Sequence, residues 1–114
     1  SEIEIRQPHS DDLTFTHRLQ SIRSRIDKVD EEIIHLIGKR MRITEELGHF
    51  KRDESVTIFQ IDRWKEILES RTMLAEQVGL SKEFITQYLE QLHKESIRKQ
   101  TKVMNQRDSG PTSL

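Results

Sequence analysis

An arginine interrupts an apolar helical seam in this sequence. Counting in sevens from Leu19 marks the two seam positions of a heptad repeat, and nine of the ten positions between residues 19 and 50 are apolar. The apolar occupants are Leu19, Ile22, Ile26, Val29, Ile33, Leu36, Ile43, Leu47 and Phe50. The tenth is Arg40, whose permanent charge is costly to bury without an anion. The position indicates either a site for an anionic ligand or a salt bridge from Arg40 to Glu45 or Glu46.

A second cation, Lys51, falls on the same side of this helix as Arg40. It follows after eleven residues, almost three full turns, so the axial gap is about 16 Å and both long side chains can close on one small anion. Arg23 precedes Arg40 by 17 residues, about 25 Å along the same helix. Arg23 therefore reaches that anion only from a second, antiparallel copy of the helix; otherwise it is a solvated surface charge.

Further polar residues fall on apolar faces of the other predicted helices. Ser96 and Gln100 are four residues apart and continue the apolar row of the third helix. They form either part of a binding site or an interhelical hydrogen-bond pair. Gln60 and Arg63 open the second helix. From the residues alone, this set indicates a cationic pocket inside a helical dimer.

Other kinds of site are not expected from the residue types. The five histidines show no spacing of three or four residues, so no helical metal site is expected. Cysteine is absent, and we find no glycine-rich phosphate loop and no nucleophile marked by a neighbouring base. A basic run on the third helix is typical of a solvated outer face.

The overall composition narrows the class of protein. The net charge of −1 argues against a nucleic-acid-binding protein, which usually carries a strong basic excess. No stretch approaches the roughly 18 apolar residues of a membrane span. A chain of 114 residues without cysteine is compatible with one domain in a reducing cytoplasm, where we expect it.

The apolar periodicity predicts three helices and no strand, and hence an all-α fold. Residues 1–13 are polar and contain Pro8, as a linker or N-terminal arm would. Residues 14–104 form the predicted helical domain, and residues 105–114 a disordered tail. The second helix is expected over about residues 58–78 and the third from a cap at Ser81 to about residue 104.

The first predicted helix is too long for one small chain to cover. It starts at a cap on Thr14 or Thr16 and runs to Phe50, with a break near Gly48 as the alternative. Some 36 residues span about 54 Å, whereas a compact domain of this size has a radius of gyration of about 13 Å. A second apolar row widens the face that must be covered. We therefore expect a partner chain, most economically a second copy in a homodimer.

The order of motifs resembles a known enzyme family. The segments "IRSRIDKVDEEIIHLIGKR", "ELGHFK", "IDR", "GLS" and "HKESIRKQ" are similar to those of the all-α, AroQ-class (type II) chorismate mutases, over about residues 19–101. This resemblance implies an intertwined homodimer of three-helix chains. It also implies an isomerase that converts chorismate to prephenate in phenylalanine and tyrosine biosynthesis, with no cofactor and no metal.

The resemblance also implies roles for individual residues. Arg40 and the partner subunit's Arg23 would bind the two carboxylates of chorismate, with Ser96 supporting one of them. Lys51 and Gln100 would bond the ether oxygen of the breaking C–O bond. A reaction within one molecule needs no nucleophile, which fits a sequence in which none is marked.

The resemblance implies that Arg63 lines the pocket. The residue after Arg63 departs from the family pattern. Many members carry a carboxylate at the next position, where it bonds the substrate's ring hydroxyl; here that residue is Trp64. Gln60 stands where an aspartate is frequent and is a candidate substitute. Isochorismate-pyruvate lyases share the fold and lack that carboxylate, so a lyase is the alternative enzyme, although Ser96 favours the mutase.

Two further alternatives concern the setting of the domain. The segments "IFQIDRW" and "HKESI" resemble mutase modules fused to 3-deoxy-7-phosphoheptulonate synthases, which implies such a synthase as a fused or associated partner. A non-catalytic dimerisation or regulatory module, whose polar seam residues only set the register, is the remaining alternative.

Overall fold

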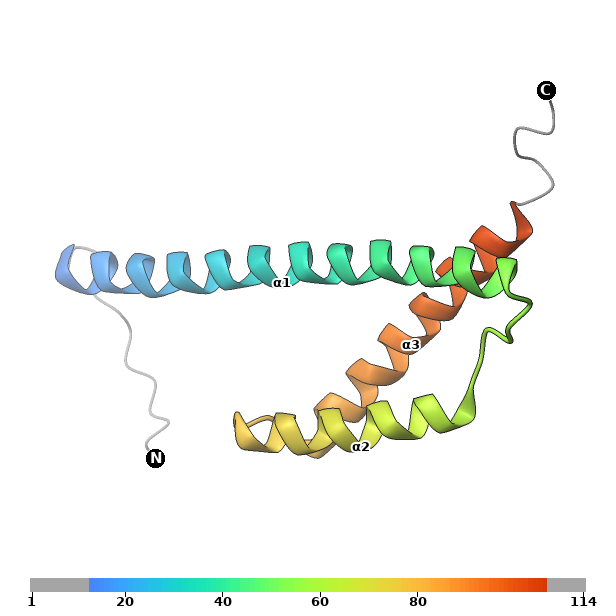
Figure 1. Cartoon of the computed structure of the whole chain (residues 1–114). Helices are drawn as coiled ribbons and strands as arrows, with labels where there is room; N and C mark the ends of the chain where they lie inside the picture. The colour runs from blue at the N-terminus through green and yellow to red at the C-terminus, as the bar shows by residue number, and fades with distance from the viewer. Residues whose placement is uncertain (1–12, 107–114) are drawn as a thin grey trace, which may run out of the picture. The chain divides into compact units, whose positions relative to one another are not determined.

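The computed structural model describes residues 13–106, and these residues form three helices and no strand (Figure 1). The helices are α1 (Leu13–Asp53), α2 (Ile61–Gln77) and α3 (Lys82–Asn105). The predicted all-α class is confirmed. Most of the predicted N-terminal arm and C-terminal tail lies outside the described residues. Among the described residues, no helix combines the length and the apolarity that a membrane-crossing segment needs.

The helix boundaries follow local signals in two places and depart from them in two others. Ser81 caps α3, since its Oγ accepts the backbone N–H of Phe84 at 3.1 Å, as predicted. Gly79 follows α2 with a φ of 85°, the left-handed conformation that glycine adopts at little cost. The predicted caps at Thr14 and Thr16 are wrong, because both threonines lie inside α1.

The chain divides into two units, Ser1–Gly38 and Lys39–Leu114, with the boundary inside α1. The described part of the first unit is the N-terminal portion of α1, and none of its described residues is buried. Its seam side chains from Ile22 to Leu36 are 43% to 63% exposed. The predicted apolar seam is therefore present along this portion of α1 and is not covered by the unit's own described residues.

A small apolar core joins α2 and α3 in the second unit. Ile67 and Ala75 of α2 pack with Ile85 and Leu89 of α3, and partly buried aromatic and aliphatic side chains surround them. These residues recur at helical spacing on each helix, so one face of each amphipathic helix supplies the core. The core is small, and α1 meets α3 largely through polar and small residues instead.

The C-terminal portion of α1 buries Met41, Thr44, Gly48 and Lys51. They follow one another at intervals of three and four residues, so they share one face of the helix. The helix continues through Gly48, so the alternative of a break there is wrong. A Cβ built at this glycine would lie 3.1 Å from the Cα of Gln100, so glycine permits a close approach between the backbones of α1 and α3.

The Gly48→Ala variant tests this close approach. We expect a loss of about 1 kcal/mol or more in the free energy of unfolding. The added methyl would crowd the backbone of α3 at Gln100, which cannot change rotamer as a side chain can. Alanine otherwise favours a helix by about 1 kcal/mol over glycine, so helix propensity alone predicts the opposite sign. Urea unfolding measures the difference, with the exposed α1 position Glu46→Ala as the matched control. A Gly48→Ala variant more stable than the wild type would contradict the account.

Candidate active site

Arg40 of α1 and Ser96 of α3 form the first contact of the site. The guanidinium Nη1 donates to the serine Oγ at 2.6 Å. The serine hydroxyl donates in turn to the carbonyl oxygen of Leu92 at 2.9 Å. Because that donation orients the hydroxyl, its lone pairs face the guanidinium. The arginine is thus held by a neutral acceptor.

Lys51 and Gln100 form the second contact between the same two helices. The ammonium Nζ donates to the Gln100 Oε1 at 2.9 Å and to the carbonyl oxygen of Ile58 at 2.7 Å. The glutamine Nε2 donates to the Ser96 carbonyl oxygen at 3.4 Å, a long bond that a better acceptor can replace. An ammonium has three N–H donors. One of them has no acceptor among the described residues.

These groups line one cavity of about 110 Å³ in the second unit. All six site residues predicted from this part of the chain line it: Arg40, Lys51, Gln60, Arg63, Ser96 and Gln100. No described residue in the lining carries a carboxylate, so three cations face a space without a built-in anion. Arg23 lies on the portion of α1 that belongs to the first unit, where it is exposed.

The surroundings of Arg40 and Lys51 lower the pKa of both side chains. Burial lowers the pKa of Arg40, and the nearby Arg71 and Arg63 lower it further, while Tyr88 acts in the opposite direction. Burial also lowers the pKa of the Lys51 ammonium. Such shifts mean that the charged forms are disfavoured by their surroundings. A bound anion would reverse this imbalance.

A salt bridge does not compensate Arg40 among the described residues. The predicted alternative partner Glu45 instead lies 3.7 Å from the Nζ of Lys99, and no described carboxylate forms an ion pair with Arg40. Arg63 is paired, with Glu66 at 2.7 Å, but both side chains are more than half exposed, so that pair contributes little. The interpretation of Arg40 as a structural salt bridge is therefore wrong.

The residue patterns did not identify two polar members of the cavity wall, His93 and Thr44, as site residues. His93 stacks on Trp64, with ring centroids 4.1 Å apart and an interplanar angle of 19°. It precedes Ser96 by three residues and so shares its face of α3, a signal that was present in the sequence. Thr44 lies four residues after Arg40, on the same face of α1.

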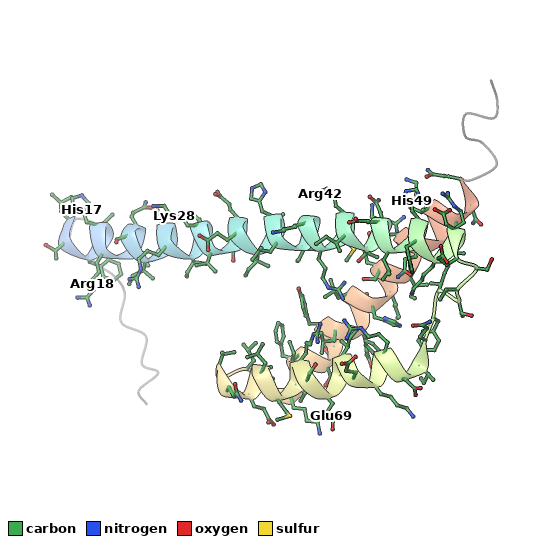
Figure 2. All side chains as sticks on the ribbon, viewed as in Figure 1. His17, Arg18, Lys28, Arg42, His49 and Glu69 are labelled. Carbon is green, nitrogen blue, oxygen red and sulfur yellow. The ribbon has the colours of Figure 1, made fainter. Side chains whose placement is uncertain are left out.

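The Arg40→Met variant tests whether this arginine serves the fold or a ligand. The change removes a poorly compensated charge and one hydrogen bond, while the Ser96 hydroxyl keeps its bond to the Leu92 carbonyl. We expect the Tm of the ligand-free protein to stay unchanged or to rise by a few degrees. Arg42→Met is the control, since Arg42 is exposed and lies on the same helix (Figure 2). A clearly larger fall in Tm for Arg40→Met than for the control would assign Arg40 a structural role.

Comparison with known proteins places this chain in a family. Residues 22–101 match the family model of chorismate mutase type II. Over 84 residues the chain is 31% identical to the T-protein of Haemophilus influenzae, covering 74% of this chain and 22% of that protein. Over 87 residues it is 31% identical to the bifunctional chorismate mutase/prephenate dehydratase of Buchnera aphidicola subsp. Schizaphis graminum, covering 76% of this chain and 23% of that protein.

The similarity covers only part of each relative. The bifunctional chorismate mutase/prephenate dehydratase of Aquifex aeolicus is 32% identical over 60 residues, 53% of this chain and 17% of that protein. The chain spans about a fifth of the length of these curated relatives. No solved structure gives a significant match. On the family model and the relatives together, the chain belongs to the type II chorismate mutase family.

Proposed function

We propose that this chain catalyses the Claisen rearrangement of chorismate to prephenate, a step in phenylalanine and tyrosine biosynthesis. The observation that carries the proposal is the cavity in which Arg40, Lys51 and Gln100 meet without a described carboxylate. Chorismate is a dianion, and the family to which the chain belongs is named for its conversion. The site offers several hydrogen-bond donors. It has no marked nucleophile, and a reaction within one molecule needs none.

Substrate binding is assigned to the arginines. Arg40 would bind one carboxylate, with the Ser96 hydroxyl beside it, and Arg63 would line the pocket. Clamping the two carboxylates holds the flexible substrate in a compact, chair-like geometry, so part of the activation entropy is lost on binding rather than in the chemical step. An anion also relieves the repulsion between Arg40 and its cationic neighbours.

Lys51 and Gln100 are assigned to the breaking C–O bond. Negative charge grows on the ether oxygen as this bond lengthens, so a donor there binds the transition state more strongly than the substrate. The ammonium has an unused N–H, and the Gln100 amide has a long, replaceable bond. Even about 10⁶-fold catalysis requires only some 8 kcal/mol, which a buried cation in a preorganised pocket can supply.

A homodimer in which the partner subunit's Arg23 completes each site is also part of the proposal. Its support is the uncovered seam along α1, where large apolar side chains such as Ile26 and Leu36 are more than half exposed. A contiguous apolar stripe of this kind is typical of an association surface. An antiparallel second copy would cover the stripe and bring its arginine to the cavity.

The isochorismate-pyruvate lyase reaction is the second candidate activity. Trp64 occupies a position where mutases often carry a carboxylate, and the lyases lack that carboxylate. A fused or associated 3-deoxy-7-phosphoheptulonate synthase and a cytoplasmic location stay predictions. The matched relatives are several times longer than this chain, and some are named as bifunctional.

Product analysis tests the activity, and Lys51→Ala tests the mechanism. We expect the wild type to convert chorismate to prephenate, observed by NMR. Lys51→Ala should lose more than about 10²-fold in kcat/KM with its helical circular dichroism retained, because a transition-state donor is removed. The exposed Lys94→Ala is the control on α3. Pyruvate and salicylate formed from isochorismate alone would establish the lyase instead, and full activity of Lys51→Ala would contradict the mechanism.

Gln100→Glu tests the assignment of the ether-oxygen donor. The new carboxylate would lie beside the Lys51 ammonium, which keeps it ionised and unable to donate at neutral pH. We expect kcat/KM at pH 7 to fall more than about tenfold and to recover toward acid as the carboxyl gains its proton. The Gln100 amide of the wild type does not titrate, so the wild type should show no such recovery toward acid. The exposed Gln91→Glu is the control, and unchanged activity of Gln100→Glu at pH 7 would contradict the assignment.

Subunit mixing tests whether two chains share each site. Arg23→Ala and Lys51→Ala should each be nearly inactive alone. After equal amounts are unfolded and refolded together, half of the dimers are mixed, and each mixed dimer holds one intact site of two. We therefore expect recovery of about a quarter of wild-type activity. Recovery no greater than the sum of the two separate variants would contradict the shared site.

A further inference from the structure

His93 presents an imidazole with no hydrogen-bond partner among the described residues, and it lies in the wall of the candidate active site. Its described contacts are with aromatic rings and with the electrostatic field of two cations. A polar group that is partly buried in a functional cavity without a partner is a candidate for contact with a ligand. The roles assigned so far make no use of it.

Two aromatic side chains hold the His93 ring in place. The indole of Trp64 stacks against one face at 4.1 Å, and Phe59 approaches at 5.5 Å with an interplanar angle of 62°. Imidazole nitrogens donate and accept hydrogen bonds in the plane of the ring. Stacking occupies the face of the ring and therefore leaves in-plane hydrogen bonding open, while it restricts the rotation of the side chain.

The surroundings of His93 favour its neutral form. Burial lowers the pKa of the imidazole below its ordinary value of 6.5, and Arg40 and Lys51 of α1 lower it further. Arg63 of α2 lines the same cavity and adds a third positive charge. No described carboxylate lines the cavity to oppose them. A neutral imidazole has one N–H donor and one lone-pair acceptor.

The ring hydroxyl of the substrate needs a hydrogen-bond acceptor, which the cations cannot supply. The two carboxylates and the ether oxygen of chorismate accept hydrogen bonds, and arginine and lysine only donate. The ring hydroxyl must also donate. The Gln100 Oε1 already accepts a hydrogen bond from Lys51, and the Ser96 Oγ accepts one from Arg40. The described wall holds three further side-chain acceptors with no hydrogen bond among the described residues, namely His93, Gln60 and Thr44.

We propose that His93 is a specificity-determining residue that accepts a hydrogen bond from the ring hydroxyl of the substrate, and that Trp64 positions its imidazole by stacking. The inference rests on the proposed mutase activity and names the contact that replaces the carboxylate missing at position 64. The place of the hydroxyl on the ring is what distinguishes chorismate from isochorismate. An acceptor fixed in the wall therefore selects between them.

The test compares chorismate with its analogue lacking the ring hydroxyl. We expect His93→Leu to lower kcat/KM for chorismate about tenfold or more, because the hydroxyl loses its acceptor. The same variant should change kcat/KM for the deoxy analogue by less than about twofold. His93→Asn supplies an amide oxygen and should recover much of the loss for chorismate. Gln60→Leu and Thr44→Val serve as matched variants of the other two acceptors.

The pH profile adds a readout that a merely structural role would not move. The ratio of kcat/KM for chorismate to that for the analogue should decline below pH 6.5 in the wild type, because protonation removes the acceptor from an imidazole whose pKa lies below that value. The ratio in His93→Asn should not decline, since asparagine does not titrate there.

The outcomes separate the two levels of the proposal. Failure of the wild type to convert chorismate would overturn the proposed function itself. With an active wild type, equal losses on both substrates in His93→Leu would overturn the role of His93. A hydroxyl-dependent loss in Gln60→Leu or Thr44→Val but not in His93→Leu would do the same and would assign the contact to that residue.

Discussion

The candidate site depends on two cations of α1 that are held by neutral acceptors, on α3 and in the segment before α2. Arg40 reaches a serine hydroxyl and Lys51 reaches a glutamine amide and a backbone carbonyl, so neither charge is neutralised by a described carboxylate. Neutral acceptors orient a cation and leave its charge available, whereas a carboxylate would compete with an anionic substrate. Gly48 permits the close approach of the α1 and α3 backbones beside Gln100.

The seam pattern exposed the site because Arg40 violates it. Helical spacing then related Lys51 to Arg40 and Ser96 to Gln100, and the structure brings all four to one cavity. Gly48 could not be interpreted in the same way, since a glycine within a helix looks like a weak point until the neighbouring backbone is known. The Trp64–His93 stack joins two helices, and no spacing within one helix predicts it.

The fold combines a small apolar core with a long uncovered seam. The α2–α3 core is a handful of side chains, while seam residues such as Ile43 and Phe50 remain more than half exposed. Burial of a seam depends on what covers it, so periodicity alone predicts the stripe and not its partner. Stability and activity are therefore expected to share one cause, because the association that covers the seam would also bring Arg23 of the partner subunit to the site.

Calorimetric binding of a rigid bicyclic ether that carries two carboxylates tests the central claim most directly. Such a compound has the compact geometry and the ether oxygen of the transition state, and it does not react. If Arg40 and Lys51 bind the geometry of the transition state, the wild type should bind the bicyclic ether far more tightly than chorismate. Arg40→Met and Lys51→Ala should each weaken binding of this compound by about 10²-fold or more. Absence of binding, or equal affinity in the wild type and both variants, would contradict the account.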